Sequence, residues 1–123
     1  MSYADTISLV AGDTAPPITY TLRDSNTAAP GQTLDPDNPA TWAPINLTGA
    51  TVRFYIRAIG SAVLKDTVVG TLITPASGVV ALIWNPTTLD TPGQYEVETE
   101  ITFADNSVQT VYQLTRLKVR ADF

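Results

Sequence analysis

Three glutamates on alternate positions form the pattern in this chain that most resembles a chemical site. If the segment is a strand, Glu96, Glu98 and Glu100 point from the same face. Carboxylate oxygens are the ligands that hard cations such as Ca²⁺ prefer. Neighbouring members of the row would lie about 6.7 Å apart, which is too far to share one ion unless another strand closes the site.

The end of the chain suggests a simpler role for this acidic row. Arg116, Lys118 and Arg120 also occupy alternate positions. A three-residue hairpin loop at 105–107 predicts these cross-strand partners: Arg116 for Glu96, Leu114 for Glu98 and Tyr112 for Glu100. A two-residue loop would turn the basic residues to the opposite face. We expect a solvated, partly paired face in which each exposed pair contributes about 0.2–1 kcal/mol.

The remaining acidic motifs are interpreted as turns. Asp35-Pro36-Asp37-Asn38 resembles the start of a calcium-binding loop, but the following Gly and the closing Glu of the EF-hand pattern are missing. Asp13 and Asp24 flank a predicted strand without any further support for a glycosidase pair. We therefore predict no metal site.

The chain has neither histidine nor cysteine. A Ser-His-Asp relay, a thiol nucleophile and the usual zinc ligands are therefore excluded. Acid–base chemistry would have to come from carboxylates alone. We predict that the protein is not an enzyme, that it has no catalytic residues and that it binds no cofactor.

The charge balance restricts the partners. Twelve acidic and seven basic residues give a net charge of −5, whereas non-specific nucleic-acid binding requires a basic surface. Anionic membranes are disfavoured for the same reason. No apolar run approaches the length of a membrane span, and residues 1–20 lack the apolar segment of a signal peptide. We expect no nucleic acid and no membrane among the partners.

Strict alternation of apolar and polar residues predicts the strands that position these side chains. After the turn-forming segment Asn46-Leu47-Thr48-Gly49, residues 50–57 place Val52, Phe54 and Ile56 on one face. Residues 94–103 alternate most regularly. Further strands are expected at 6–10, 18–23, 62–73 (as one strand or two), 79–84 and 108–120. The 79–84 run is apolar on both faces, which predicts a strand covered on both sides.

Seven to eight short strands without a helical period indicate an all-β fold, an antiparallel two-sheet sandwich over residues 1–123 as a single domain. The segment Asp90-Thr91-Pro92-Gly93-Gln94-Tyr95 resembles the tyrosine corner of immunoglobulin-like sandwiches, in which the Tyr hydroxyl bonds to upstream backbone. Trp84 is expected in the core, where its indole N–H needs a partner.

One long loop, residues 25–44, interrupts the strand pattern. Pro36, Pro39 and Pro44 argue against a regular ladder there, and loops of this length are usually functional or disordered. Three interpretations remain: a loop folded back with a tryptophan covering an open edge of the core, an arm reaching a neighbouring subunit, or plain disorder. For the arm, the candidate interface residues are Leu34, Asp35, Asp37, Trp42 and Ile45.

Four segments in the same order resemble a family of phage domains. They are Leu9-Val10-Ala11-Gly12-Asp13-Thr14-Ala15-Pro16, residues 45–54, residues 78–84, and Gly93-Gln94-Tyr95-Glu96-Val97-Glu98. The chain is similar to the N-terminal domain of the upper baseplate proteins of tailed bacteriophages. The resemblance implies an immunoglobulin-like β-sandwich without catalytic residues that anchors a receptor-binding or fibre module. Residues 25–44 depart from the family as an insertion.

Together these observations predict a non-enzymatic bacteriophage virion protein. It would act as a structural or adaptor protein in the baseplate, the tail or fibre attachment. We expect it to be made in the cytoplasm of the bacterial host, to dock onto other virion subunits and to form a homo-oligomer in the particle. The alternative is a carbohydrate- or receptor-binding module at the tail tip or on the capsid surface, with Trp42 and Tyr55 as stacking platforms.

Overall fold

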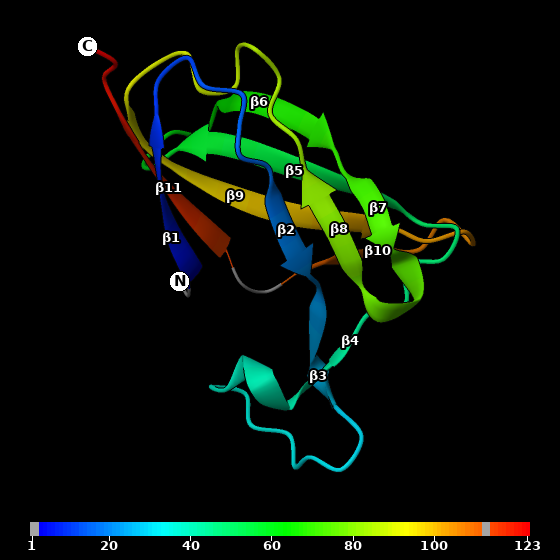
Figure 1. Ribbon diagram of the computed structural model, residues 1–123. Helices are drawn as coiled ribbons and strands as arrows, with labels where there is room; N and C mark the ends of the chain where they lie inside the picture. Colours follow the sequence, from blue (N-terminus) through cyan, green and yellow to red (C-terminus); the bar gives the residue numbers. More distant parts are fainter. Residues whose placement is uncertain (1–2, 112–113) are drawn as a thin grey trace.

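The computed structural model describes residues 3–111 and 114–123 and shows two sheets facing each other (Figure 1). The larger sheet has the order β1-β11-β9-β5-β6, and β10 also pairs with β9; the smaller has the order β2-β8-β7. The strands of the larger sheet are β1 (Tyr3–Val10), β5 (Thr51–Ala58), β6 (Leu64–Val69), β9 (Gly93–Thr102), β10 (Val108–Thr110) and β11 (Leu114–Arg120). Those of the smaller sheet are β2 (Ile18–Thr21), β7 (Thr71–Thr74) and β8 (Val79–Leu82). The predicted all-β fold is confirmed, and the arrangement is consistent with a β-sandwich.

The core lies between β5 and the smaller sheet. Val52, Phe54 and Ile56 are at most 1% exposed, as their alternation predicts. They belong to one buried cluster with Val80 of β8. The Tyr20 ring of β2 stacks on Phe54, with ring centroids 5.2 Å apart.

One continuous run of chain belongs to both sheets. β6 pairs with β5 in the larger sheet, and β7 pairs with β8 in the smaller one. Gly70 separates them, and its N–H still donates to Val52 O at 2.8 Å. A Cβ at this position would lie 2.7 Å from Val80 Cγ2 and 2.9 Å from Phe54 Cε2. The crossing between sheets therefore requires a residue without a side chain.

Two contacts expected from sequence are present. The Tyr95 hydroxyl donates to Thr91 O at 2.7 Å, which is the hydrogen bond expected of a tyrosine corner. The Trp84 indole N–H donates to Pro16 O at 2.8 Å, and the ring is buried. Both polar groups are thus satisfied inside the fold.

The topology differs from the prediction in three respects. β1 and β11 pair in parallel, because the two strands come from opposite ends of the chain and no hairpin constrains their direction. The described residues contain eleven strands instead of seven or eight. The 79–84 run is not covered on both sides throughout, since Ile83 is half exposed just beyond β8.

The extra strands arise mainly in the segment expected to lack a ladder. β3 (Arg23–Ala28) and β4 (Trp42–Pro44) form a two-stranded antiparallel ribbon. A single-turn 3-10 helix, η1 (Pro39–Thr41), precedes β4, and a second, η2 (Pro75–Ser77), precedes β8. Within the described ranges there is no helix with the length and apolar character of a membrane span.

The final hairpin keeps one predicted pairing and changes another. Glu96 lies opposite Arg116, as expected, but Glu100 lies opposite Thr110. The Phe103 N–H donates to Ser107 O, so the loop comprises residues 104–106 instead of 105–107. The register then shifts between β10 and β11. The expected Glu100 partner, Tyr112, lies outside the described residues.

We expect Gly70→Ala to lower the free energy of unfolding by about 1–3 kcal/mol, because the new methyl group would overpack the contact between the sheets. Urea denaturation monitored by tryptophan fluorescence measures this change. Thr71→Ala is the matched control, since Thr71 is the exposed next residue, at the start of β7, and its change should stay within about 0.5 kcal/mol. Equal destabilisation by the two variants would contradict the close-approach argument.

Candidate functional site

Residues 23–44 form an arm that projects from one end of the sandwich (Figure 1). Its ladder begins where Arg23 pairs with Pro44. On the sandwich side of this pair, Leu22 and Ile45 are buried in the core, and the Ile45 N–H donates to Leu22 O at 2.9 Å. The arm is therefore fixed at its root by two core residues.

Trp42 holds the arm in shape from the inside. Its side chain is only 2% exposed. The indole N–H donates to Asp35 O at 2.9 Å, and Arg23 Nη1 donates to Trp42 O at 3.1 Å. Burial thus removes Trp42 from the surface, both as an interface anchor and as a stacking platform for a sugar. Ile45, at 7% exposure, is likewise unavailable to a partner because it belongs to the sandwich core.

The indole also connects the arm to the sandwich. Together with Tyr20, Thr99 and Thr115, Trp42 lines a cavity of about 60 Å³ at their junction. This agrees with the expectation that the tryptophan covers an open edge of the core. The rest of the arm projects from the sandwich. The segment therefore combines a tryptophan that covers the core edge with a projecting arm.

The Asp35–Asn38 motif forms turns. The Asp37 N–H donates to Asp35 Oδ1 at 3.0 Å, and the Ala40 N–H donates to Asn38 Oδ1 at 3.1 Å. The Thr41 hydroxyl donates to Asn38 O at 2.8 Å. In the described part of the chain, no group of His, Cys, Asp or Glu residues is placed to hold a metal ion. The turn interpretation is confirmed.

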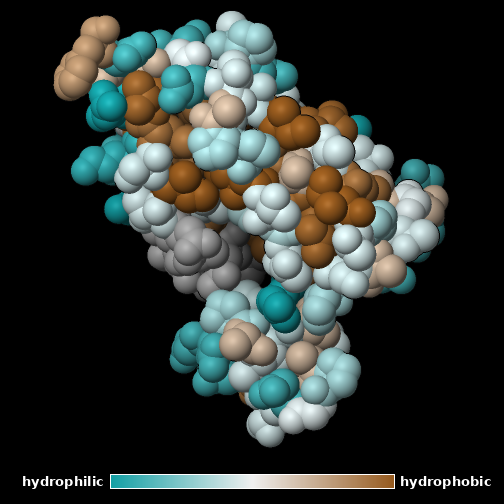
Figure 2. Space-filling view, viewed as in Figure 1, coloured by the Kyte–Doolittle hydropathy of each residue, from teal (hydrophilic) through white to brown (hydrophobic). Residues whose placement is uncertain are grey.

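The surface of the arm is mainly polar (Figure 2), and its charged residues beyond Arg23 are all aspartates. Asp35 and Asp37 are exposed and Leu34 is partly exposed, so three of the five expected interface residues are accessible. Between positions 24 and 44 the sequence has three aspartates and no lysine or arginine, a charge of −3. The face of the smaller sheet seen above the arm carries apolar patches instead, with Ile73 and Ile83 half exposed.

The acidic row on β9 is paired mainly with β5. Arg57 Nε lies 2.7 Å from Glu96 Oε1, and Glu96 is buried. The Tyr55 hydroxyl donates to Glu100 Oε1 at 3.0 Å. This hydrogen bond, with a smaller contribution from burial, raises the pKa of the Tyr55 phenol. Sequence reasoning sought partners only on the last strand, because pairing with a strand 39 residues away leaves no local signal.

A depression on this charged face is too small for a substrate. Tyr55, Arg57, Leu64, Glu98 and Leu114 are among the residues around its volume of about 60 Å³, which is room for a few water molecules. Its lining contains no serine, threonine, histidine or cysteine beside the carboxylates. The arrangement provides an ion pair between Arg57 and Glu96.

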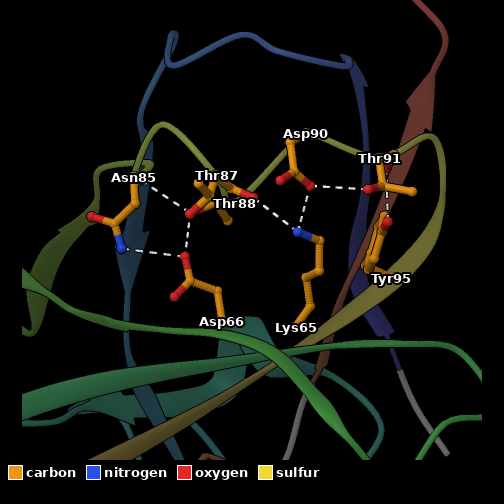
Figure 3. A network of polar contacts seen from close by, with 8 residues as sticks. All are labelled: Lys65, Asp66, Asn85, Thr87, Thr88, Asp90, Thr91 and Tyr95. Carbon is orange, nitrogen blue, oxygen red and sulfur yellow. Dashed lines mark hydrogen bonds and ion pairs between the residues drawn. The ribbon is translucent and has the colours of Figure 1, made fainter.

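A second polar network fastens β6 to the connection between β8 and β9 (Figure 3). Lys65 Nζ contacts Asp90 Oδ1 at 2.5 Å. Asp66 Oδ2 accepts hydrogen bonds from the Thr88 hydroxyl and from Asn85 Nδ2. Because these side chains satisfy one another, the network serves structure. Sequence reasoning missed it, since only the fold brings Lys65 and Asp66 to this connection.

The comparisons with known proteins add no family to these observations. No family model matches the chain, and no curated protein matches it either. The candidate site therefore rests on the arm and on the charge pattern of the larger sheet.

We expect Trp42→Phe to loosen the arm without destabilising the sandwich. Losing the hydrogen bond to Asp35 O removes about 0.5–1.5 kcal/mol, so amide hydrogen exchange in residues 24–44 should accelerate roughly 2- to 10-fold. Trp84→Phe is the matched control, because it removes the corresponding bond to Pro16 O inside the core. It should lower the urea midpoint of the whole protein, whereas Trp42→Phe should not. An equal loss of global stability in both variants would contradict a separately ordered arm.

The Lys65–Asp90 contact should appear in the titration of Asp90. Hydrogen bonding from Lys65, and then from Thr91, lowers the pKa of Asp90 below its usual 3.8. The pair therefore stabilises the fold above about pH 3.8, and this contribution is lost as the pH falls through the lowered pKa. Lys65→Met should raise the pKa of Asp90 in a carboxyl NMR titration. The lowered pKa of Asp105, which comes from Ser107, should stay unchanged as the internal control.

Proposed function

We propose that this chain is a non-enzymatic structural or adaptor protein of a bacteriophage virion that acts by protein–protein docking through its arm. The observation that carries the proposal is the ordered projection of residues 23–44, held by Trp42 and Arg23 and exposing Asp35 and Asp37. A surface that is already ordered loses little conformational entropy when a partner binds. An arm of this kind suits docking.

The chemistry of the described residues supports a role without catalysis. The glutamates that would have to supply acid–base groups are used in pairing, Glu96 with Arg57 and Glu100 with Tyr55. Asp66 and Asp90 are held in the network at β6. Each of these four carboxylates forms a hydrogen bond or an ion pair that holds two strands or connections together.

The assignment to a virion rests on the resemblance of four segments to the N-terminal domain of phage upper baseplate proteins. Their positions in the fold support it. One segment contains the end of β1, a second contains the Asn46–Gly49 turn and the first half of β5, and the last begins β9. The hydrogen bond from Tyr95 to Thr91 O favours the immunoglobulin-like variety of sandwich that the resemblance implies.

The insertion identifies the part of the molecule that gives this chain its own docking specificity. Baseplate, tail and fibre-attachment positions all require contacts between subunits, and the arm is the segment that departs from the family. The alternative role as a carbohydrate- or receptor-binding module loses one of its two stacking platforms, because Trp42 is buried. We therefore favour docking to other virion subunits.

An arm-deletion variant tests this function. Asp24 and Ala43 are cross-strand partners, so replacing residues 25–42 with Asn-Gly closes the ribbon with a two-residue turn. We expect the variant to keep its β-sheet circular dichroism. It should no longer be incorporated into phage particles produced with it in place of the natural chain.

The readout is mass spectrometry of purified particles. The control is full-length Thr71→Ala, which changes an exposed position away from the arm and should be incorporated normally. Absence of the natural chain from purified particles, or normal incorporation of the folded deletion variant, would contradict the proposal.

A further inference from the structure

A second feature, a basic depression, lies at the end of the sandwich away from the arm. Residues Ser8, Leu9 and Val10 of β1 and Lys118 and Arg120 of β11 line a depression of about 280 Å³. The parallel register pairs Ser8 with Lys118 and Val10 with Arg120, which places the two cationic side chains in one row beside β1. Both are exposed.

Neither cation of this depression is paired with a carboxylate among the described residues. The ion pairs Arg57–Glu96 and Lys65–Asp90 lie elsewhere and involve neither cation. Arg120 donates from Nη1 to Ala121 O at 3.0 Å and lies over the Phe123 ring. The lining therefore combines two positive charges with the partly exposed apolar side chain of Val10, while the Leu9 side chain belongs to the buried core.

The arm has the complementary character. With Arg23 at its base the arm carries a charge of −2, and its part from position 24 to 44 carries −3; the partly exposed Leu34 adjoins the exposed Asp35. The depression offers cations with apolar walls, and the arm offers carboxylates with an apolar neighbour. Such complementarity steers association and selects the partner.

The two features cannot meet within one molecule. In Figure 1 the arm projects from the bottom of the sandwich, whereas β1 and β11 end near the top, beside the C-terminus. The base of the arm is fixed by Leu22 and Ile45 in the core. An arm that occupies the depression would therefore have to belong to another molecule.

We propose that the arm of one copy docks into the β1–β11 depression of a second copy, so that the protein associates head to tail. This inference rests on the proposed docking function and names its partner. Because the two contacting surfaces differ, each bound copy still presents one free arm and one free depression. Such heterologous contacts build rings when the rotation closes and filaments when it does not.

Charge reversal in pairs tests the contact. Asp35→Lys with Asp37→Lys reverses the arm, and Lys118→Glu with Arg120→Glu reverses the depression. In sedimentation velocity at low salt, we expect the natural chain to form oligomers whose size increases with protein concentration and decreases with added salt. Each reversed variant should associate at least roughly tenfold more weakly, because like charges then face each other.

A mixture of the two reversed variants provides the decisive test. In the mixture the basic arm of one variant meets the acidic depression of the other, and the acidic arm of the second meets the basic depression of the first. An equimolar mixture should therefore form a mixed complex in which the two variants alternate in equal numbers, which neither variant forms alone. Asp13→Lys provides a control of opposite sign. It makes the same substitution next to the depression, since the Asp13 N–H donates to Val10 O, and should strengthen association. Circular dichroism of each variant verifies the fold.

Monomeric natural chain at every concentration would overturn the inference, as would association unchanged by arm reversal or failure of the mixture to form the complex. These outcomes are separable from the particle experiment. Loss of incorporation on arm deletion, together with a monomeric natural chain, would leave docking to a different virion subunit and remove the head-to-tail contact. Normal incorporation of the deletion variant, together with head-to-tail association of the natural chain, would remove the proposed docking function in the virion and leave the head-to-tail contact.

Discussion

The close approach of the two sheets around Phe54 is the constraint on which the rest of the structure depends. Phe54 is fully buried, stacks on Tyr20 and faces the backbone of Gly70. Because residue 70 has no side chain, the chain can leave the larger sheet at the end of β6 and continue as β7 in the smaller one. At the other end of β6, Lys65 contacts Asp90 in the connection between β8 and β9.

The arm is organised on a different principle. Its order comes from one buried indole and from side chains that bond to nearby backbone. The prolines that argued against a ladder occupy positions compatible with one, since Pro39 begins η1 and Pro44 ends β4. Ordering a segment of this length costs conformational entropy. This cost is met during folding, which leaves the exposed surface of the arm ready for a partner.

Charge is distributed unevenly between the two ends of the molecule. On the larger sheet the β9 glutamates are matched by groups such as Arg57 and Tyr55. Away from that matched region, the arm is acidic, and the depression between β1 and β11 carries Lys118 and Arg120. Unmatched charges at separated ends favour contacts between molecules over contacts within one molecule. A net charge of −5 alone would not reveal this polarity.

Features that depend on near neighbours along the chain could be predicted from the residues alone. Alternation identified the core face of β5, and the Asn46–Gly49 turn was evident from its residue types. The resemblance of residues 90–95 to a tyrosine corner predicted that the Tyr95 hydroxyl bonds to upstream backbone, and the structure supplies the acceptor, Thr91 O. Only the tertiary structure decided which distant segments meet. It paired β1 with β11 in parallel, gave Glu96 its partner on β5 and buried Trp42 inside the arm. The physical reason is that periodicity records which face of a strand is apolar, whereas partners and burial depend on strands brought together by the whole fold.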